Sequence, residues 1–169
     1  MINRQSTMIR PFSPADLSAV CEIQRKCPQA GQWREEDYLR LATDEGGTIL
    51  VAEVANANQR EIAGFAAFLC LRDEADLRNL AVDPARQRKG IARALLTAGL
   101  GAMQSSGVQK LFLDVRASNQ PARALYASLG FHLMYTRRNY YHEPEEDGLV
   151  MACEMNRHAE AKGLHGELT

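Results

Sequence analysis

The sequence has no long hydrophobic run and almost no net charge. No stretch approaches the ~20 apolar residues that a membrane-spanning helix needs, and the polar N-terminus lacks the apolar centre of a signal peptide. The 20 basic and 21 acidic residues give a net charge of -1, without the overall basic excess of a dedicated nucleic-acid coat protein. We therefore expect a cytoplasmic protein that binds neither membranes nor nucleic acid directly.

Cysteine and histidine are too few and too scattered for a disulfide framework or a metal centre. The four cysteines form no Cys-x-x-Cys pair, and the four histidines show no metal-ligand spacing. Cys70 and Cys153 lie in apolar, strand-like runs, where a thiol behaves as a small hydrophobic group. We expect reduced, structural cysteines and no metal.

What remains is an ordinary globular composition, with 46% hydrophobic and 24% charged residues in 169 positions. A chain of this length buries roughly 70% of its unfolded surface, so a hydrophobic core alone can stabilise it. We expect one domain over residues 8–156, with loose ends at 1–7 and 157–169.

Local signals divide the chain into helices and strands. Ser13 followed by Pro14 is typical of a helix start, and Ile91, Leu95 and Ala98 repeat at helical spacing. After a first strand, the sequence predicts helices from Ser13 to before Pro28 and over 34–43, 90–106 and 119–129, and strands over 48–54, 62–71, 75–82, 108–115, 131–141 and 149–155. This order predicts a single-domain α/β fold with a mixed central sheet flanked by helices.

Small and basic residues gather where the strand ending at Val82 passes into the helix starting at Gly90. Backbone N–H groups at a helix start have no intrahelical acceptor, and the helix dipole adds positive potential there. Basic residues at that end favour an anion, although they are alternatively explained as solvated side chains. They are Arg86, Arg88, Lys89 and Arg93. The loop has neither the P-loop pattern nor Gly-x-Gly-x-x-Gly, so we expect another kind of phosphate-bearing ligand.

Two stretches carry a family resemblance. Residues 80–92 read Leu-Ala-Val and then Gln-x-x-Gly-x-Ala, which resembles the acetyl-CoA signature of the GNAT N-acetyltransferases. Residues 119–131 resemble the second CoA-binding stretch of that superfamily. Residues 113–119 and 137–141 are similar to the bacterial ribosomal-protein-alanine N-acetyltransferases, a branch that acetylates protein N-termini.

The resemblance implies a GNAT fold and acetyl-CoA as cosubstrate, without a metal. Backbone amides around the loop would hold the pantetheine and pyrophosphate. The cofactor-binding residues it implies are Leu80, Ala81, Val82, Gln87, Arg88, Lys89, Gly90, Ile91, Ala92, Arg93 and Asn119.

The resemblance also implies a general base at Asp114 and a general acid at Tyr126. Related enzymes carry glutamate at the first position, and aspartate is one methylene shorter. A water relay, or a different carboxylate at Glu74 or Asp76, is therefore an alternative. Read from the residues alone, Asp114 is also explained as a polar residue at a solvated strand end, and Tyr126 as a core tyrosine.

Acceptor-side residues carry a weaker signal. In the resemblance, Trp33, Tyr140 and Tyr141 flank the groove for the incoming peptide, and Glu74 and Asp76 are further substrate-side candidates. The acidic turn at 143–147 either attracts a basic polypeptide or is simply solvated. Two arginines at 137 and 138 without aromatic platforms are too little for RNA recognition.

The resulting hypothesis is an N-acetyltransferase that acts on the N-terminal α-amino group of a protein, with a ribosomal protein as a candidate partner. One alternative keeps the fold and cofactor but accepts a lysine side chain or a small-molecule amine. Another is a non-catalytic sensor that binds acyl-CoA without turnover. Tyr126 argues against the sensor, because a sensor needs no proton donor.

Overall fold

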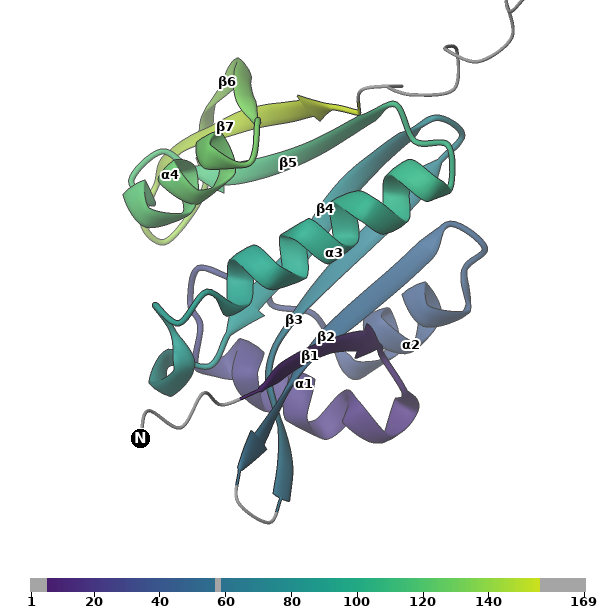
Figure 1. Cartoon of the computed structure of the whole chain (residues 1–169). Helices are drawn as coiled ribbons and strands as arrows, with labels where there is room; N and C mark the ends of the chain where they lie inside the picture. The colour runs from purple at the N-terminus through teal and green to yellow at the C-terminus, as the bar shows by residue number, and fades with distance from the viewer. Residues whose placement is uncertain (1–5, 57–58, 156–169) are drawn as a thin grey trace, which may run out of the picture.

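The computed structural model describes residues 6–56 and 59–155, which form a seven-stranded sheet with helices on both faces (Figure 1). The strands are β1 (Thr7–Pro11), β2 (Gly47–Asn56), β3 (Gln59–Leu71), β4 (Glu74–Val82), β5 (Lys110–Arg116), β6 (His132–Tyr141) and β7 (Glu146–Glu154). The helices are α1 (Leu17–Arg25), α2 (Glu35–Thr43), α3 (Ile91–Ser105) and α4 (Gln120–Ser128), with short 3-10 turns η1 (Pro14–Asp16) and η2 (Pro84–Arg86). The predicted order of elements is confirmed.

The sheet is mixed, as the sequence predicts. Its strand order is β1-β2-β3-β4-β5-β7-β6, and β4 with β5 is the parallel pair among antiparallel neighbours. β1 begins at Thr7, and β7 begins at Glu146, so the last two acids of the expected turn at 143–147 are strand residues. Of the ends that we expected to be loose, residues 1–5 and 157–169 lie outside the described ranges.

The first helix begins later than its sequence signal. The Ser13 side chain accepts a hydrogen bond from the Ala15 amide, and the Asp16 carboxylate accepts one from the Ser13 amide. These bonds form a cap around a 3-10 turn, and the α-helix follows from Leu17. Arg10 of β1 holds Asp16 through two bonds of 2.8 and 2.9 Å, which ties this turn to the sheet.

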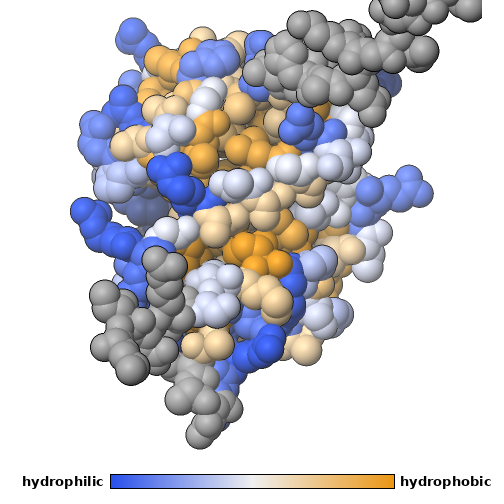
Figure 2. All heavy atoms as spheres, in the orientation of Figure 1, coloured by the Kyte–Doolittle hydropathy of each residue, from blue (hydrophilic) through white to orange (hydrophobic). Residues whose placement is uncertain are grey.

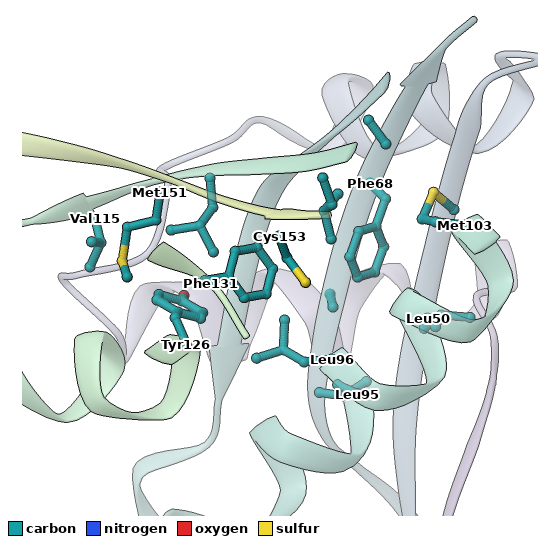
Figure 3. Packing of buried hydrophobic residues seen from close by; sticks show 14 of the residues in the cluster. Leu50, Phe68, Leu95, Leu96, Met103, Val115, Tyr126, Phe131, Met151 and Cys153 are labelled. Carbon is teal, nitrogen blue, oxygen red and sulfur yellow. The ribbon is translucent and has the colours of Figure 1, made fainter. Parts of the chain in front are cut away.

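Two hydrophobic cores lie on opposite faces of the sheet. The first packs α3 and α4 against it, with Leu95, Leu96 and Tyr126 among its buried residues (Figure 3). The second packs α1 and α2 against the other face around Val20 and Tyr38. All four cysteines are free thiols, and Cys21, Cys27 and Cys153 are buried. Among the described residues, none of the helices has the length and apolar character that crossing a bilayer requires.

β4 and β5 separate part-way along their length. They pair only from Glu74 with Lys110 to Leu77 with Leu113. Beyond that point β5 continues beside β7, while β4 continues beside β3, and Figure 1 shows the two strands running apart. The backbone edges of residues 78–82 and 114–116 therefore face an opening in the sheet.

Candidate active site

A cavity of about 210 Å³ lies where α3 begins, beside the opening between β4 and β5. Its lining residues are Val82, Arg86, Gln87, Arg88, Gly90, Ile91, Ala92, Arg93 and Leu125. Gly90 is the N-cap of α3 with a φ of 80°, a left-handed conformation that favours glycine. A Cβ added at Gly90 would meet nothing within 4 Å, and the first-turn residues Ile91, Ala92 and Arg93, whose amides have no partner within a helix, line the cavity.

Two basic residues of this loop bond to side chains of other elements. The Arg86 guanidinium forms a 2.9 Å ion pair with Glu61 of β3, and Arg93 donates a 2.9 Å hydrogen bond to Ser128. Arg88 and Lys89 are exposed. Arg86, Arg88 and Arg93 all line the cavity, although the Arg86 charge also has a partner on β3. That the four basic residues surround one anion stays a prediction. Figure 2 shows hydrophilic residues at the left edge of the view, where α3 begins.

Side chains hold the backbone at the end of β4, where cofactor-binding residues are predicted. The Val82 carbonyl accepts hydrogen bonds from Gln87 Nε2 at 3.2 Å and from the Cys27 thiol at 3.2 Å. The Leu80 amide donates to Asn79 Oδ1 at 3.0 Å, at the edge that faces the opening. Asn119 is the N-cap of α4 and accepts a hydrogen bond from the Ala122 amide, so its side-chain oxygen has a capping role.

Asp114 stands on the open face of β5, opposite Val150 of β7. Its neighbours Leu113 and Val115 are buried in the first core, so strand alternation turns the carboxylate to the other face. Arg137 of β6 lies 3.6 Å away, Nε to Oδ1, and both side chains are more than a third exposed. At such exposure the pair is weak and can yield to an incoming cation.

Glu74 and Asp76, the alternative candidates for the base, lie on the neighbouring strand β4. Asp76 is opposite Phe112, and Glu74 is opposite Lys110 at the far end of β4. Partial desolvation raises the pKa of Asp76 above its ordinary value. Arg78 opposes that shift, and the charge of Asp114 adds to it. Of these two carboxylates, Asp76 is therefore the nearer to Asp114.

Tyr126 of α4 lies beneath the sheet in the first core and is 6% exposed. Its ring is 5.8 Å from that of Phe131, and Figure 3 shows both beside Met151. Burial raises the pKa of the Tyr126 phenol well above its usual range, so the hydroxyl stays protonated at neutral pH. The core reading of its ring is confirmed, while a role for the hydroxyl stays a prediction.

Tyr141 links the two predicted catalytic residues electrostatically. Burial and the charge of Asp114 raise the pKa of Tyr141 to about 12, and Tyr141 in turn contributes to the raised pKa of Tyr126. The Arg116 guanidinium lies over the Tyr141 ring, 4.4 Å from its centroid. Tyr141 of β6 therefore interacts electrostatically with both Asp114 of β5 and Tyr126 of α4.

The hairpin of β6 and β7 is fastened by groups that the sequence did not single out. Arg116 donates to Glu146 at 2.9 Å, and both the amide and the hydroxyl of Ser118 donate to that carboxylate at 3.0 Å. These donors lower the pKa of Glu146. Asp147 accepts a hydrogen bond from the Asn139 amide. Two of the four acids at 143–147 thus hold the hairpin, and attraction of a basic acceptor stays a prediction for the others.

Trp33 lies between α1 and α2, as predicted, and packs on Tyr38 with ring centroids 5.0 Å apart. Tyr140 is 43% exposed at the end of β6. The described residues contain no group of three or more metal-ligating side chains that could hold an ion.

Comparison with known proteins decides the family. Residues 17–131 match the model of the Acetyltransferase (GNAT) family. The chain belongs to this family. The ribosomal protein bS18-alanine N-acetyltransferase of Escherichia coli (strain K12) is 38% identical over 146 residues, covering 85% of this chain and 95% of that protein. The protein of that name from Haemophilus ducreyi is 46% identical over 148 residues, covering 86% and 98%.

A solved structure of the family agrees with the fold. The crystal structure of the ribosomal-protein-S18-alanine N-acetyltransferase from Escherichia coli matches with a TM-score of 0.78 and 34% identity, covering 92% of this chain and 98% of that one. The GNAT fold, the acetyltransferase activity and the resemblance to ribosomal-protein-alanine enzymes are thereby confirmed. The roles of individual residues stay predictions.

Proposed function

We propose that this protein transfers the acetyl group of acetyl-CoA to the N-terminal α-amino group of a ribosomal protein that begins with alanine, in the cytoplasm. Support for the acceptor comes from relatives that are named for alanine acetylation of ribosomal protein bS18 and match over 95% and 98% of their length. The observation that carries the proposal is a carboxylate, Asp114, and a buried phenol, Tyr126, on opposite faces of the sheet where β4 and β5 separate.

The residues at the start of α3 fit acetyl-CoA, the cosubstrate of this family. Acetyl-CoA would supply the acetyl group as a thioester, and its pyrophosphate carries negative charge. Gly90 leaves the first-turn amides of α3 open to an anion, and exposed Arg88 and Lys89 add positive charge beside them. The unpaired inner edge of β4 at residues 80–82 offers backbone groups to the amides of pantetheine. Gln87, Ile91, Ala92 and Arg93 line the same cavity. Leu80, Ala81, Lys89 and Asn119 of α4 are not among its lining residues.

Asp114 takes the proton from the attacking amine. Only a neutral amine is a nucleophile, and an α-amino group with a pKa of about 7.7 to 8.0 needs only a modest base near neutral pH. The short side chain reaches the amine through one water or directly. Arg137 pairs with the carboxylate at 3.6 Å, and this exposed pair is weak enough to exchange for the cationic N-terminus of the acceptor.

Tyr126 assists the departing sulfur from the other face. Burial keeps its hydroxyl protonated, and also makes it a weaker acid than in water. We therefore expect it to act first as a hydrogen-bond donor to the developing negative charge, with proton transfer late in the step.

Acetylation of a lysine side chain or a small amine, and acyl-CoA sensing without turnover, are the alternatives. The test is an assay of CoA release with acetyl-CoA and three acceptor classes: peptides that begin with alanine, N-terminally blocked peptides with lysine, and small amines. We expect alanine peptides to react at least about tenfold faster than the other classes. Faster reaction of either other class, or tight acetyl-CoA binding without CoA release from any acceptor, would contradict the proposal.

A further inference from the structure

Three buried polar side chains fasten the connection between α1 and α2 to the sheet. Gln24 of α1 donates from Nε2 to the Trp33 carbonyl at 2.8 Å and accepts from the Trp33 amide at 3.0 Å. Asn79 of β4 donates to the Gly31 carbonyl at 3.0 Å and accepts from the Gly31 amide at 3.0 Å. Tyr38 of α2 donates to Gln24 Oε1 and accepts from Asn79 Nδ2 at 3.0 Å.

Burying this network costs free energy, and its hydrogen bonds hold one particular segment, the connection between α1 and α2. The exposed fractions of Gln24, Tyr38 and Asn79 are 4%, 0% and 4%, and burying polar groups is unfavourable unless each finds its partners. Apolar side chains would fill the same space at a lower cost. Four of the bonds end on the backbone of Gly31 and Trp33, so the network specifies where that connection lies.

The connection lies at the opening of the sheet, on the face that carries Asp114. Asn79 comes two residues after Leu77, where the pairing of β4 with β5 stops. Its partners are on α1, α2 and their connection, which cover the face opposite α3 and α4. The proposed cofactor cavity is lined by residues of the α3 side. An amine that approaches from the side of Asp114 therefore passes between residues 31–33 and the hairpin of β6 and β7.

Asn79 also links residues 31–33 to β4, the strand proposed to bind pantetheine. Its Oδ1 atom accepts from Gly31 of the connection and from Leu80 of β4 at 3.0 Å each. The position of residues 31–33 is thereby fixed relative to β4.

We propose that Gln24, Tyr38 and Asn79 are positioning residues that hold residues 31–33 as one wall of the acceptor site and so set the affinity for the acceptor amine. The inference rests on the proposed function for the identity of that acceptor. A purely structural network would lower thermal stability without a selective change in acceptor affinity.

Trp33 gives a readout that needs no activity, because it is the single tryptophan of the chain and half-buried. Two variants loosen the wall: Gln24→Met removes both bonds to Trp33, and Tyr38→Phe removes only the hydroxyl of the network while keeping the ring contacts. The matched control is Val20→Ala, a buried truncation in the same core that touches none of the three residues' hydrogen bonds. We expect Trp33 to become more accessible to acrylamide and its emission to shift to the red in both variants but not in the control.

Steady-state kinetics provides the second readout. The acceptor KM should rise about tenfold in Gln24→Met and by a smaller factor in Tyr38→Phe, while the acetyl-CoA KM stays within about twofold and Val20→Ala changes neither. Unchanged Trp33 quenching in Tyr38→Phe, or equal changes of both KM values, would overturn the inference. If the wild-type protein acetylates a small amine instead of a peptide, the proposed function fails, and the same comparison with that amine still decides the positioning role.

Discussion

At the residue scale, Asp114 is exposed on one face and Tyr126 is buried on the other, and this contrast suits their proposed roles. The carboxylate must meet a hydrated ammonium group, and its contact with Arg137 at 3.6 Å is weak enough to exchange. The phenol must stay protonated, as any tyrosine is at neutral pH, and burial raises its pKa further.

Removing the base should produce a pH-dependent defect. Below pH 7 fewer than about one fifth of free α-amino groups are neutral, so Asp114→Asn should lower kcat/KM by roughly 10²-fold or more at pH 6 to 7. The defect should shrink above pH 8, where the acceptor loses its proton unaided. The measurement is kcat/KM against pH with an alanine-initiated peptide.

The conservative variant tests whether reach matters. Asp114→Glu should keep or improve activity, because the side chain is one methylene longer and can contact the amine directly instead of through a water. Full activity of Asp114→Asn with an unaltered pH profile would move the base elsewhere, and Asp76 would be the next residue to replace.

Removing the phenol hydroxyl should slow the chemical step alone. Tyr126→Phe keeps the ring that packs beside Phe131, so the fold should survive. Turnover should fall roughly 10²- to 10⁴-fold, with acetyl-CoA affinity unchanged in calorimetry. A fall of less than about threefold, measured where chemistry limits the rate, would return Tyr126 to a purely structural role.

At the element scale, the N-terminus of α3 is the part of the site that the chain specifies most locally. A strand end, a glycine with positive φ and a helix start occur within about a dozen residues, and their signals are all visible in sequence. The start of α1 is similar: Ser13 caps the turn that leads into it, although this is a 3-10 turn and the helix itself begins at Leu17.

Charge at this helix start should weaken acetyl-CoA binding. Asparagine tolerates the left-handed conformation of Gly90, and the space around its Cβ is open, so Gly90→Asn and Gly90→Asp differ in little but charge. Gly90→Asp should lower acetyl-CoA affinity at least about tenfold relative to Gly90→Asn, with a gap that narrows at high salt. Equal affinities in calorimetry would place the pyrophosphate elsewhere.

Contacts between elements distant in sequence could not be predicted. The pairs Arg86 with Glu61 and Arg116 with Glu146 join residues 25 and 30 positions apart. Neither charge pattern nor periodicity identifies such partners, because tertiary packing brings them together. Asn79 did carry a usable signal, since it is a lone amide beside the apolar strand end at residues 80–82. Its partners Gln24 and Tyr38 lie on helices, and the sequence pattern does not predict where those helices pack.

At the scale of the whole molecule, the site depends on a sheet that opens between β4 and β5 and is covered by a different core on each face. The alternation of Leu113, Asp114 and Val115 predicts that the carboxylate faces away from its neighbours. The sequence does not reveal that α4 brings Tyr126 to the opposite face of that opening. In the proposed function, one face serves the cofactor and the other the acceptor.

The central claim is that the acceptor is an α-amino group at a protein N-terminus. The most direct measurement uses one peptide that begins with alanine and contains an internal lysine, incubated with acetyl-CoA and the protein at pH 7, and locates the acetyl group by tandem mass spectrometry. We predict acetylation of the alanine α-amino group with the lysine unmodified, because that amine is partly neutral at this pH whereas lysine, with a pKa near 10.4, is almost fully protonated. Acetylation of the lysine with a free N-terminus would contradict the account.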